Sequence, residues 1–206
     1  MIRRGLIISA LMSAAAIVAA SALASPPPPA TSPVTKVLPA QKSPEVIAAG
    51  KAAFVDVARV LQSPRCQNCH PAGDAPLQTD HGVRHAQNIT RLGTDAGLAC
   101  TTCHQGHNSE AVGVPNGPPG APDWKLPPDD MPMVFEGKTL RALCEQEKNP
   151  ETNGHKTLDE LVDHVENAPL VLWAWQPGGK RTLPPLTHAQ FVAAFRTWVA
   201  SGGACP

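Results

Sequence analysis

Apolar residues recur at helical spacing near the start of the globular part of the chain. Ser43 followed by Pro44 is typical of a helix N-terminus, because the serine side chain caps the helix and proline suits its first turn. A stripe of apolar residues then runs to Leu61, and Pro64 ends the helix. The positions on this stripe are Val46, Ile47, Phe54, Val57, Ala58 and Leu61.

The last third of the chain has the same periodicity. A short helix is expected over 137–148. Thr157 and Thr187 each begin a capping box, T-x-x-E and T-x-x-Q, and predict helices that run to about residues 167 and 201. The residues expected to face inward are Leu158, Leu161, Val162, Val165, Phe191, Phe195, Trp198 and Val199.

The segments between these helices have no sustained period. Residues 71–98 and 115–128 are rich in proline and glycine, so we expect loops with at most one short helix near 86–92. The apolar stretch 170–175 contains two tryptophans and is expected to form the wall of a pocket. The predicted fold class is therefore mostly α, with short helices and long Pro/Gly-rich loops.

The first 24 residues predict a secretory signal peptide. Arg3 and Arg4 precede an apolar run over 5–20, and Ala22-Leu23-Ala24 fits the small-x-small cleavage rule. An uncleaved anchor is the alternative, but the run is shorter than the roughly 20 residues that a membrane-spanning helix needs. We expect cleavage after Ala24, a periplasmic protein and no transmembrane segment after cleavage.

The expected domain boundaries follow from the signal and the proline content. Residues 25–43 contain six prolines and predict an extended linker, so the folded domain should cover 44–206. Seventeen Lys and Arg balance 17 Asp and Glu, and a neutral chain lacks the basic footprint of nucleic-acid binding.

Two copies of one five-residue motif carry the candidate chemistry. Cys66-Gln67-Asn68-Cys69-His70 and Cys100-Thr101-Thr102-Cys103-His104 both have the pattern C-x-x-C-H. This is the attachment signature of c-type haem. The two cysteines form thioether bonds to the haem vinyl groups, and the histidine is the proximal ligand of the iron. The sequence therefore predicts two covalently attached haem c groups, around which the domain would pack.

Two other interpretations use the same cysteines. A zinc site with four cysteine ligands usually has about 15–20 residues between its pairs, and here 30 residues separate Cys69 from Cys100. Two disulfides are the other alternative. Neither explains why a histidine follows both second cysteines.

The sixth ligands of the irons are less constrained. No histidine precedes Cys66, and neither does any methionine of the mature chain, so the first haem must draw its distal ligand from downstream. His81 and His85 are nearest, and His85 is preferred because it begins a possible short helix. For the second haem the candidates are Met131 or Met133; His107 lies too close to His104 to serve the same iron. The remaining histidines, expected at the surface or in caps, are His155, His164 and His188.

Cys144 and Cys205 remain after the motif cysteines are assigned. In an oxidising compartment two remaining cysteines most simply form a disulfide. This bridge would join the last helix to the predicted helix over 137–148.

The chain resembles small periplasmic dihaem c-type cytochromes in its paired motifs, its exported start and its closing F-x-x-W-V-x-x-G helix, Phe195 to Gly202. It is most similar to bacterial proteins labelled as a cytochrome subunit of isoquinoline 1-oxidoreductase. Two complete class I cytochrome domains cannot fit, because the motifs lie too close together. The stretches that carry the similarity are 65–74, 85–88, 100–105 and 126–137.

This resemblance implies an electron-transfer protein, not an enzyme in its own right. The implied partner is a periplasmic molybdenum hydroxylase with iron–sulfur clusters, which oxidises N-heterocycles or aldehydes and needs an external electron acceptor. A dihaem peroxidase or a haem-based sensor is the alternative, and either would need one iron with an open distal side.

Overall fold

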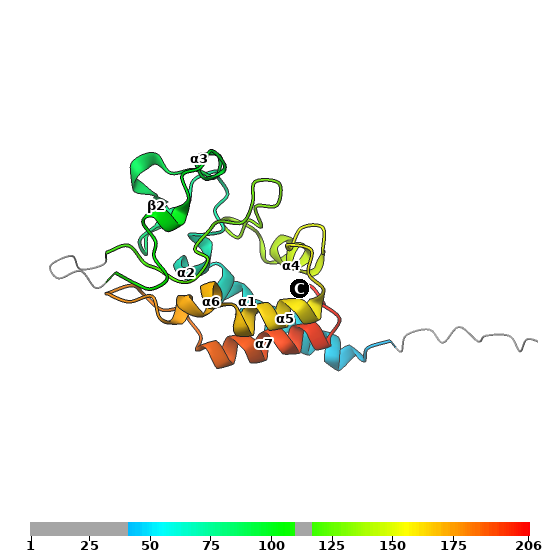
Figure 1. Cartoon of the computed structure of the whole chain (residues 1–206). Coiled ribbons are helices and arrows are strands. Elements are labelled where there is room, and N and C mark those ends of the chain that lie inside the picture. Colours follow the sequence, from blue (N-terminus) through cyan, green and yellow to red (C-terminus); the bar gives the residue numbers. More distant parts are fainter. Residues whose placement is uncertain (1–40, 110–116) are drawn as a thin grey trace, which may run out of the picture. The chain divides into compact units, whose positions relative to one another are not determined.

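The computed structural model describes residues 41–109 and 117–206. The predicted signal peptide and nearly all of the predicted linker lie outside the described residues, so both stay predictions. Figure 1 shows helices gathered on one side of the domain and long loops on the other. This confirms the mostly α fold class.

Helices account for most of the regular structure. One antiparallel hairpin, β1 (Leu77–Gln78) with β2 (Val83–Arg84), was not predicted. The α-helices are α1 (Pro44–Leu61), α2 (Pro64–Gln67), α3 (Arg91–Asp95), α4 (Leu140–Lys148), α5 (Leu158–Asn167), α6 (Pro169–Leu172) and α7 (His188–Ala200). Three 3-10 helices are η1 (Ala86–Asn88), η2 (Cys100–Thr102) and η3 (Trp173–Trp175).

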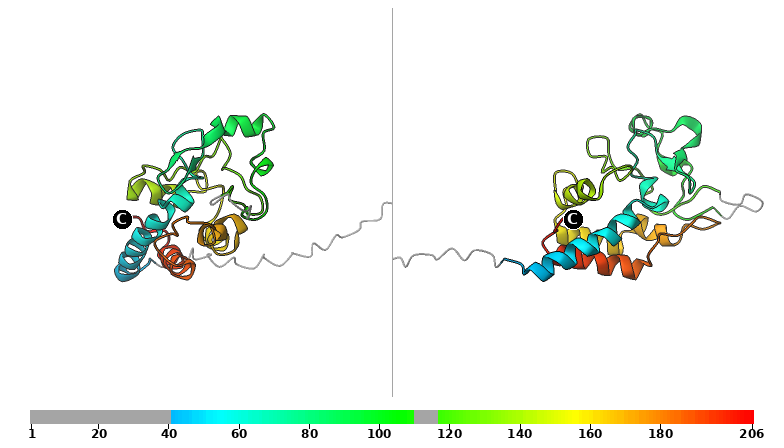
Figure 2. Two further views of the ribbon diagram at one scale, coloured as in Figure 1. Left: turned by 90° about the vertical axis from the view of Figure 1, so that its left-hand side faces the viewer. Right: turned by 180° about the vertical axis from the view of Figure 1, so that it is seen from behind.

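Helices α1 and α7 pack side by side and form the centre of the core (Figure 2). Ser43 caps α1 as predicted, its hydroxyl accepting a hydrogen bond from the Val46 N–H at 3.4 Å. The two helices approach closely at Gly50, where an added Cβ would lie 2.0 Å from the Ser201 hydroxyl. A residue larger than glycine at this position would push the helices apart.

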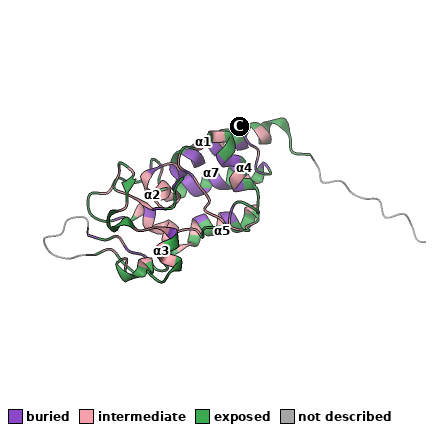
Figure 3. Cartoon of the chain, turned by 90° about the horizontal axis from the view of Figure 1, so that it is seen from above, coloured by how far each residue is buried: buried purple, intermediate pink, exposed green. Residues whose placement is uncertain are grey.

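Helix α5 covers α7, and α4 covers α1. Both predicted capping boxes are present, at Thr157 and at Thr187. The predicted Cys144–Cys205 disulfide is confirmed, with the Cα atoms 5.6 Å apart. The purple patches in Figure 3 mark the core on these helices. The core residues are Phe54, Val57, Ala58, Val60, Leu61, Phe135, Leu143, Cys144, Leu161, Val165, Phe191, Phe195, Trp198 and Cys205.

Two predicted helices differ from the structure because the backbone turns left-handed within them. Gln87 has φ 60° and Asn88 has φ 56°, so the expected helix over 86–92 is replaced by the short η1 and, after a break, α3. Gly137 has φ 68°, and the helix expected over 137–148 starts only at Leu140, where Thr139 caps it. Positive φ is incompatible with a right-handed helix.

The membrane prediction can be examined for the folded part of the chain. Over 41–109 and 117–206, none of the helices combines the length and the apolar character needed to cross a bilayer.

Candidate cofactor-binding site

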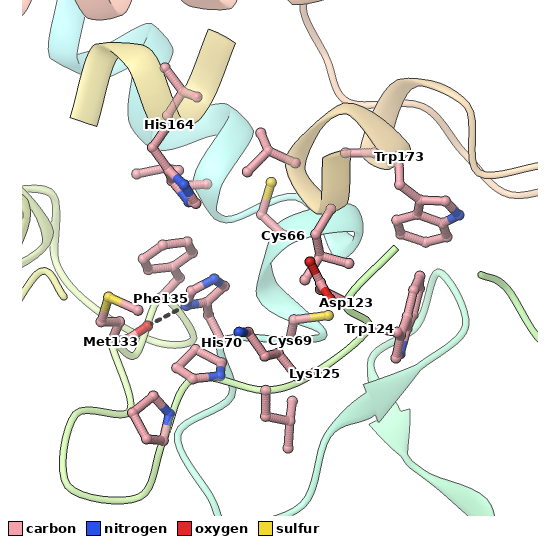
Figure 4. Close-up of a pocket in the computed structure, with 18 of the residues that line it drawn as sticks. Cys66, Cys69, His70, Asp123, Trp124, Lys125, Met133, Phe135, His164 and Trp173 are labelled. Atoms are coloured by element: carbon pink, nitrogen blue, oxygen red, sulfur yellow. Dashed lines mark hydrogen bonds between the residues drawn. The ribbon is translucent and has the colours of Figure 1, made fainter. Parts of the chain in front are cut away.

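A cavity of about 870 Å³ lies between the helices and the loops. Cofactor pockets commonly have volumes of about 300–1,000 Å³. Residues of both C-x-x-C-H motifs line it: Cys66, Cys69, His70 and Cys100. Apolar side chains from α1, α5, α6 and α7 complete the wall, including Leu61, Leu161, Val171, Phe191 and Phe195 (Figure 4). Most of the apolar stretch 170–175 lines this cavity, through Leu170, Val171, Trp173 and Ala174, but Trp175 does not.

The first motif is held at the end of α1. Pro64 opens α2, which carries Cys66 directly after the first helix. His70 lies beyond it with its ring stacked on Phe135, the centroids 3.9 Å apart and the planes 9° from parallel. Its Nδ1 is 2.7 Å from the Met133 carbonyl oxygen, to which it can donate a hydrogen bond. Such a bond fixes the tautomer and leaves Nε2 with its lone pair for a metal.

The second motif repeats this arrangement in a different loop. His104 stacks on Trp124, with centroids 4.6 Å apart and planes 5° from parallel. Its Nδ1 is 2.7 Å from the Pro119 carbonyl oxygen. The neighbouring Gly120 lies so close to the chain after the motif that an added Cβ would be 2.2 Å from the His107 carbonyl oxygen. Glycine is thus required for the loop that holds His104.

The acid–base properties of both histidines suit a ligand. Burial, the main cause, lowers the pKa of His70 to about 4. Burial also lowers the pKa of His104. The imidazoles are therefore neutral near pH 7, which is the form that coordinates a metal. Burial raises the pKa of the Cys66 thiol to about 12 and that of Cys69 to about 11. A redox-active pair needs the opposite shift, toward thiolate.

The four motif cysteines are free thiols, unlike Cys144 and Cys205. The two motifs lie near each other, since residues of both line one cavity. A charge on Cys100 would accordingly raise the pKa of Cys69. Even so, no group of three or more His, Cys, Asp or Glu side chains converges as a metal site within 41–109 and 117–206. None of the four motif cysteines is paired in a disulfide.

Two buried arginines on the cavity wall have donors without a partner. Arg65 is 6% exposed and Arg91 is 4% exposed. Arg65 Nε and Arg91 Nη2 have no hydrogen-bond acceptor in the described part of the chain. Arg65 pairs with Asp80 through Nη2, and Arg91 donates to the Pro127 carbonyl through Nε at 3.1 Å. Buried cationic donors of this kind need an anionic or carbonyl partner.

This donor set fits haem c. The cavity supplies thiols for attachment, an oriented imidazole and an apolar wall, and the arginines offer unpaired donors for the propionate carboxylates. The residues that would hold the two groups are those of the motifs: Cys66, Cys69, His70, Cys100, Cys103 and His104. The first four line this cavity, whereas Cys103 and His104 are not among its lining residues.

The structure places the candidate distal ligands differently from the sequence-based pairing. His85 was paired with the first motif, but its ring centroid is 6.0 Å from that of His104 in the second. Met131 was paired with the second motif, but its sulfur accepts a hydrogen bond from the Gly154 N–H at 2.8 Å. Met133 holds His70 of the first motif through its carbonyl. Nearness along the chain therefore did not indicate nearness in the fold.

The other histidines fall into two groups. His81, His107 and His155 are exposed, and His188 is bonded through Nε2 to the Val165 carbonyl at 2.9 Å. His164 was expected at the surface and is indeed exposed, but the surface on which it lies is the wall of the cavity. The sequence signal that could have placed His164 on this wall is its spacing on α5, one turn after the buried Leu161.

Comparisons with known proteins do not show a family for this chain. No family model matches the chain, and neither does any curated protein or solved structure.

Proposed function

We propose that this chain is a periplasmic dihaem c-type cytochrome that carries electrons. The observation that supports this most strongly is the shared arrangement of His70 and His104. Each follows a C-x-x-C pair, and each has its Nδ1 2.7 Å from a backbone carbonyl, so Nε2 remains for iron. Two copies of one pre-oriented ligand, on unrelated loops, match two copies of one cofactor.

The haem groups supply reversible one-electron chemistry between ferrous and ferric iron when bound. The chain would attach them through the cysteines and hold the imidazoles neutral and fixed. The apolar side chains of α5, α6 and α7 would keep water from the cavity. Burial in an apolar site and compensation of charge by Arg65 and Arg91 are two means by which a protein adjusts the potential of such a group.

The proposed role is that of an electron acceptor for a periplasmic dehydrogenase. The resemblance to cytochrome subunits of isoquinoline 1-oxidoreductase supports a molybdenum hydroxylase with iron–sulfur clusters as that partner. Because the two motifs lie close together, an electron that entered at one haem would have a short path to the other. No catalytic group is needed for this role.

A dihaem peroxidase or a haem sensor remains the second candidate. The observation that favours it is a polar wall of the cavity, formed by Glu147, Asn153, Lys156 and His164. Glu147 is 6% exposed, and burial raises its pKa to about 7, so it could donate a proton near neutral pH. This function would require an iron with an open distal position.

The direct test is the number of haems on variants of the exported chain. The protein is expressed together with a c-type haem maturation system, and its haem is counted from the intact mass and from the pyridine haemochrome. We expect two haems in the wild type, one in Cys66→Ala/Cys69→Ala and one in Cys100→Ala/Cys103→Ala.

The matched control is Cys144→Ala/Cys205→Ala, which removes the same number of sulfurs and should keep both haems. A wild-type chain with four free thiols and no covalent haem would overturn the proposal.

A further inference from the structure

We propose that His164 is the distal ligand of the haem at the first motif and that His85 is the distal ligand of the haem at the second. This inference rests on the proposed function. In this assignment each iron would be bound by two histidines. His70 would pair with His164 at the first haem, and His104 would pair with His85 at the second.

The case for His164 begins with its place in the fold. Helix α5 is fixed at its start by the capping box of Thr157 and Glu160, and it buries Leu161 and Val165 in the core. His164 lies between these two positions along the helix and lines the cavity together with His70. A ligand on a capped, packed helix has little freedom to move, which is the requirement for a fixed coordination site.

His164 and His70 line the same cavity, although they come from elements far apart in the sequence. In Figure 4 the His164 imidazole projects from α5 into the same space as the His70 imidazole. Nδ1 of His70 is bonded to the Met133 carbonyl, so its coordinating Nε2 lies at the other edge of the ring.

The His164 imidazole also has no other evident task. Over 41–109 and 117–206 its imidazole makes no hydrogen bond, whereas His188 bonds the Val165 carbonyl at 2.9 Å and lies tilted beside Trp175, with ring centroids 4.7 Å apart. The His164 ring nitrogens are therefore available to a group bound in the cavity.

The methionines fit the first site less well. The Met131 sulfur is engaged by the Gly154 N–H at 2.8 Å. The Met133 sulfur lies beside the same glycine, 3.3 Å from where a Cβ would be. Met133 also lines the cavity, and its carbonyl contacts the Nδ1 edge of His70. Its backbone therefore lies at the Nδ1 edge of that ring and not at Nε2, which would coordinate iron.

The second pair has a direct geometric argument. Two imidazoles that share one metal ion, with metal–nitrogen bonds of about 2 Å, have ring centres about 6 Å apart. The centroids of His85 and His104 are 6.0 Å apart, with their planes at 63°. His85 also has its Nδ1 2.6 Å from the Ala86 carbonyl, the same kind of contact that holds His70 and His104. It immediately precedes the short 3-10 helix η1.

The test measures carbon monoxide binding to the reduced holoprotein, with haem counted separately. We expect no carbon monoxide adduct in the wild type. His164→Ala and His85→Ala should each bind one carbon monoxide per two haems, and the double variant should bind two. His81→Ala and His155→Ala replace exposed histidines and are matched controls that should bind none.

A gain-of-signal variant separates ligation from a structural role. His164→Met should remain low-spin but acquire the near-infrared charge-transfer band of methionine-to-iron ligation, which the wild type should lack. Adducts that appear in Met131→Leu or Met133→Leu, and not in His164→Ala, would overturn the assignment. So would a wild type that binds carbon monoxide. A chain with no covalent haem would instead refute the proposed function, so the two failures are distinguishable.

Discussion

The helical half and the loop half of this domain are built on different principles. The helical half, α1 with α4, α5 and α7, buries its own side chains: Phe54, Leu143 and Trp198 are all 0% exposed. The loop half, residues 69–109 and 117–139, contains both motif histidines and has the more strongly exposed apolar side chains: α1 exposes Val46 at 39% and Val55 at 42%. Leu92 is 73% exposed and Leu98 is 50% exposed.

Buried polar groups differ between the halves in their charge. Trp198 Nε1 in α7 has no acceptor, and neither have Arg65 Nε and Arg91 Nη2 at the border with the loops, but only the two arginines are cationic and line the cavity. A segment that leaves buried donors unpaired and apolar side chains exposed is completed by something other than its own chain. The difference supports the proposal that the helices form a scaffold and that the loops would be completed by bound haem.

The largest expected effect is therefore confined to the loops. In Cys66→Ala/Cys69→Ala/Cys100→Ala/Cys103→Ala, which attaches no haem, amides in 69–139 should exchange hydrogen about 100-fold faster or more, because local opening there becomes nearly free. Amides in α1 and α7 should keep their protection. Hydrogen exchange with mass spectrometry measures both regions in one sample, and equal loss of protection in both would break the distinction.

The second prediction concerns the core of the helical half. Phe54 packs against Trp198, with ring centroids 5.0 Å apart. Phe54→Ala should lower the free energy of unfolding by about 3–5 kcal/mol, because it leaves a cavity between α1 and α7. Urea unfolding followed by circular dichroism checks this. The control is Val55→Ala in the same helix, at a position 42% exposed, which should change stability little.

The disulfide should contribute somewhat less. It joins cysteines 61 residues apart, and the loop-entropy model gives at most about 4 kcal/mol for such a closure. We expect Cys144→Ala/Cys205→Ala to lower the free energy of unfolding by about 2–4 kcal/mol and to leave both haems attached. If reduction of the disulfide in the wild type left the urea midpoint of unfolding unchanged, this prediction would be contradicted.

The smallest predicted effect depends on pH. Burial raises the folded-state pKa of Glu147 from 4.5 to about 7, so its neutral form is favoured in the fold. Its contribution to stability is then complete below pH 4.5 and is lost as pH rises through 7. Glu147→Gln, which cannot ionise, should stabilise the protein by about 1–3 kcal/mol at pH 8 and by nothing at pH 4.

The matched control for this titration is Glu145→Gln in the same helix. Glu145 is exposed and pairs with Arg141 at 3.6 Å. It should show no such gain at pH 8, and equal behaviour of the two variants would show that burial of Glu147 is not the cause.

The sequence predicted the helical half well because its signals are local. Ser43, Thr157 and Thr187 cap the helices that their neighbours predict, and the apolar stripes pack into one core. The errors lie where a single backbone angle decides the outcome. Left-handed angles at Gln87 and Gly137 shortened two predicted helices, and no periodicity in the side chains reveals such an angle beforehand.

The site was predictable only in part, for a different reason. The two motifs specify their own cysteines and proximal histidines through spacing alone. The partners across the cavity come from elements far away in sequence. His164 lies 94 positions after His70, and its helix also has an ordinary core-facing pattern, so its place on the cavity wall becomes visible only in the folded structure.

The most direct test of the electron-carrier account is a reductive titration of the purified holoprotein, followed by optical spectra with and without carbon monoxide. The account predicts two electrons taken up reversibly per chain, low-spin spectra in both oxidation states and no change with carbon monoxide. High-spin iron, or a carbon monoxide adduct in the wild type, would contradict it and would favour the peroxidase or sensor alternative.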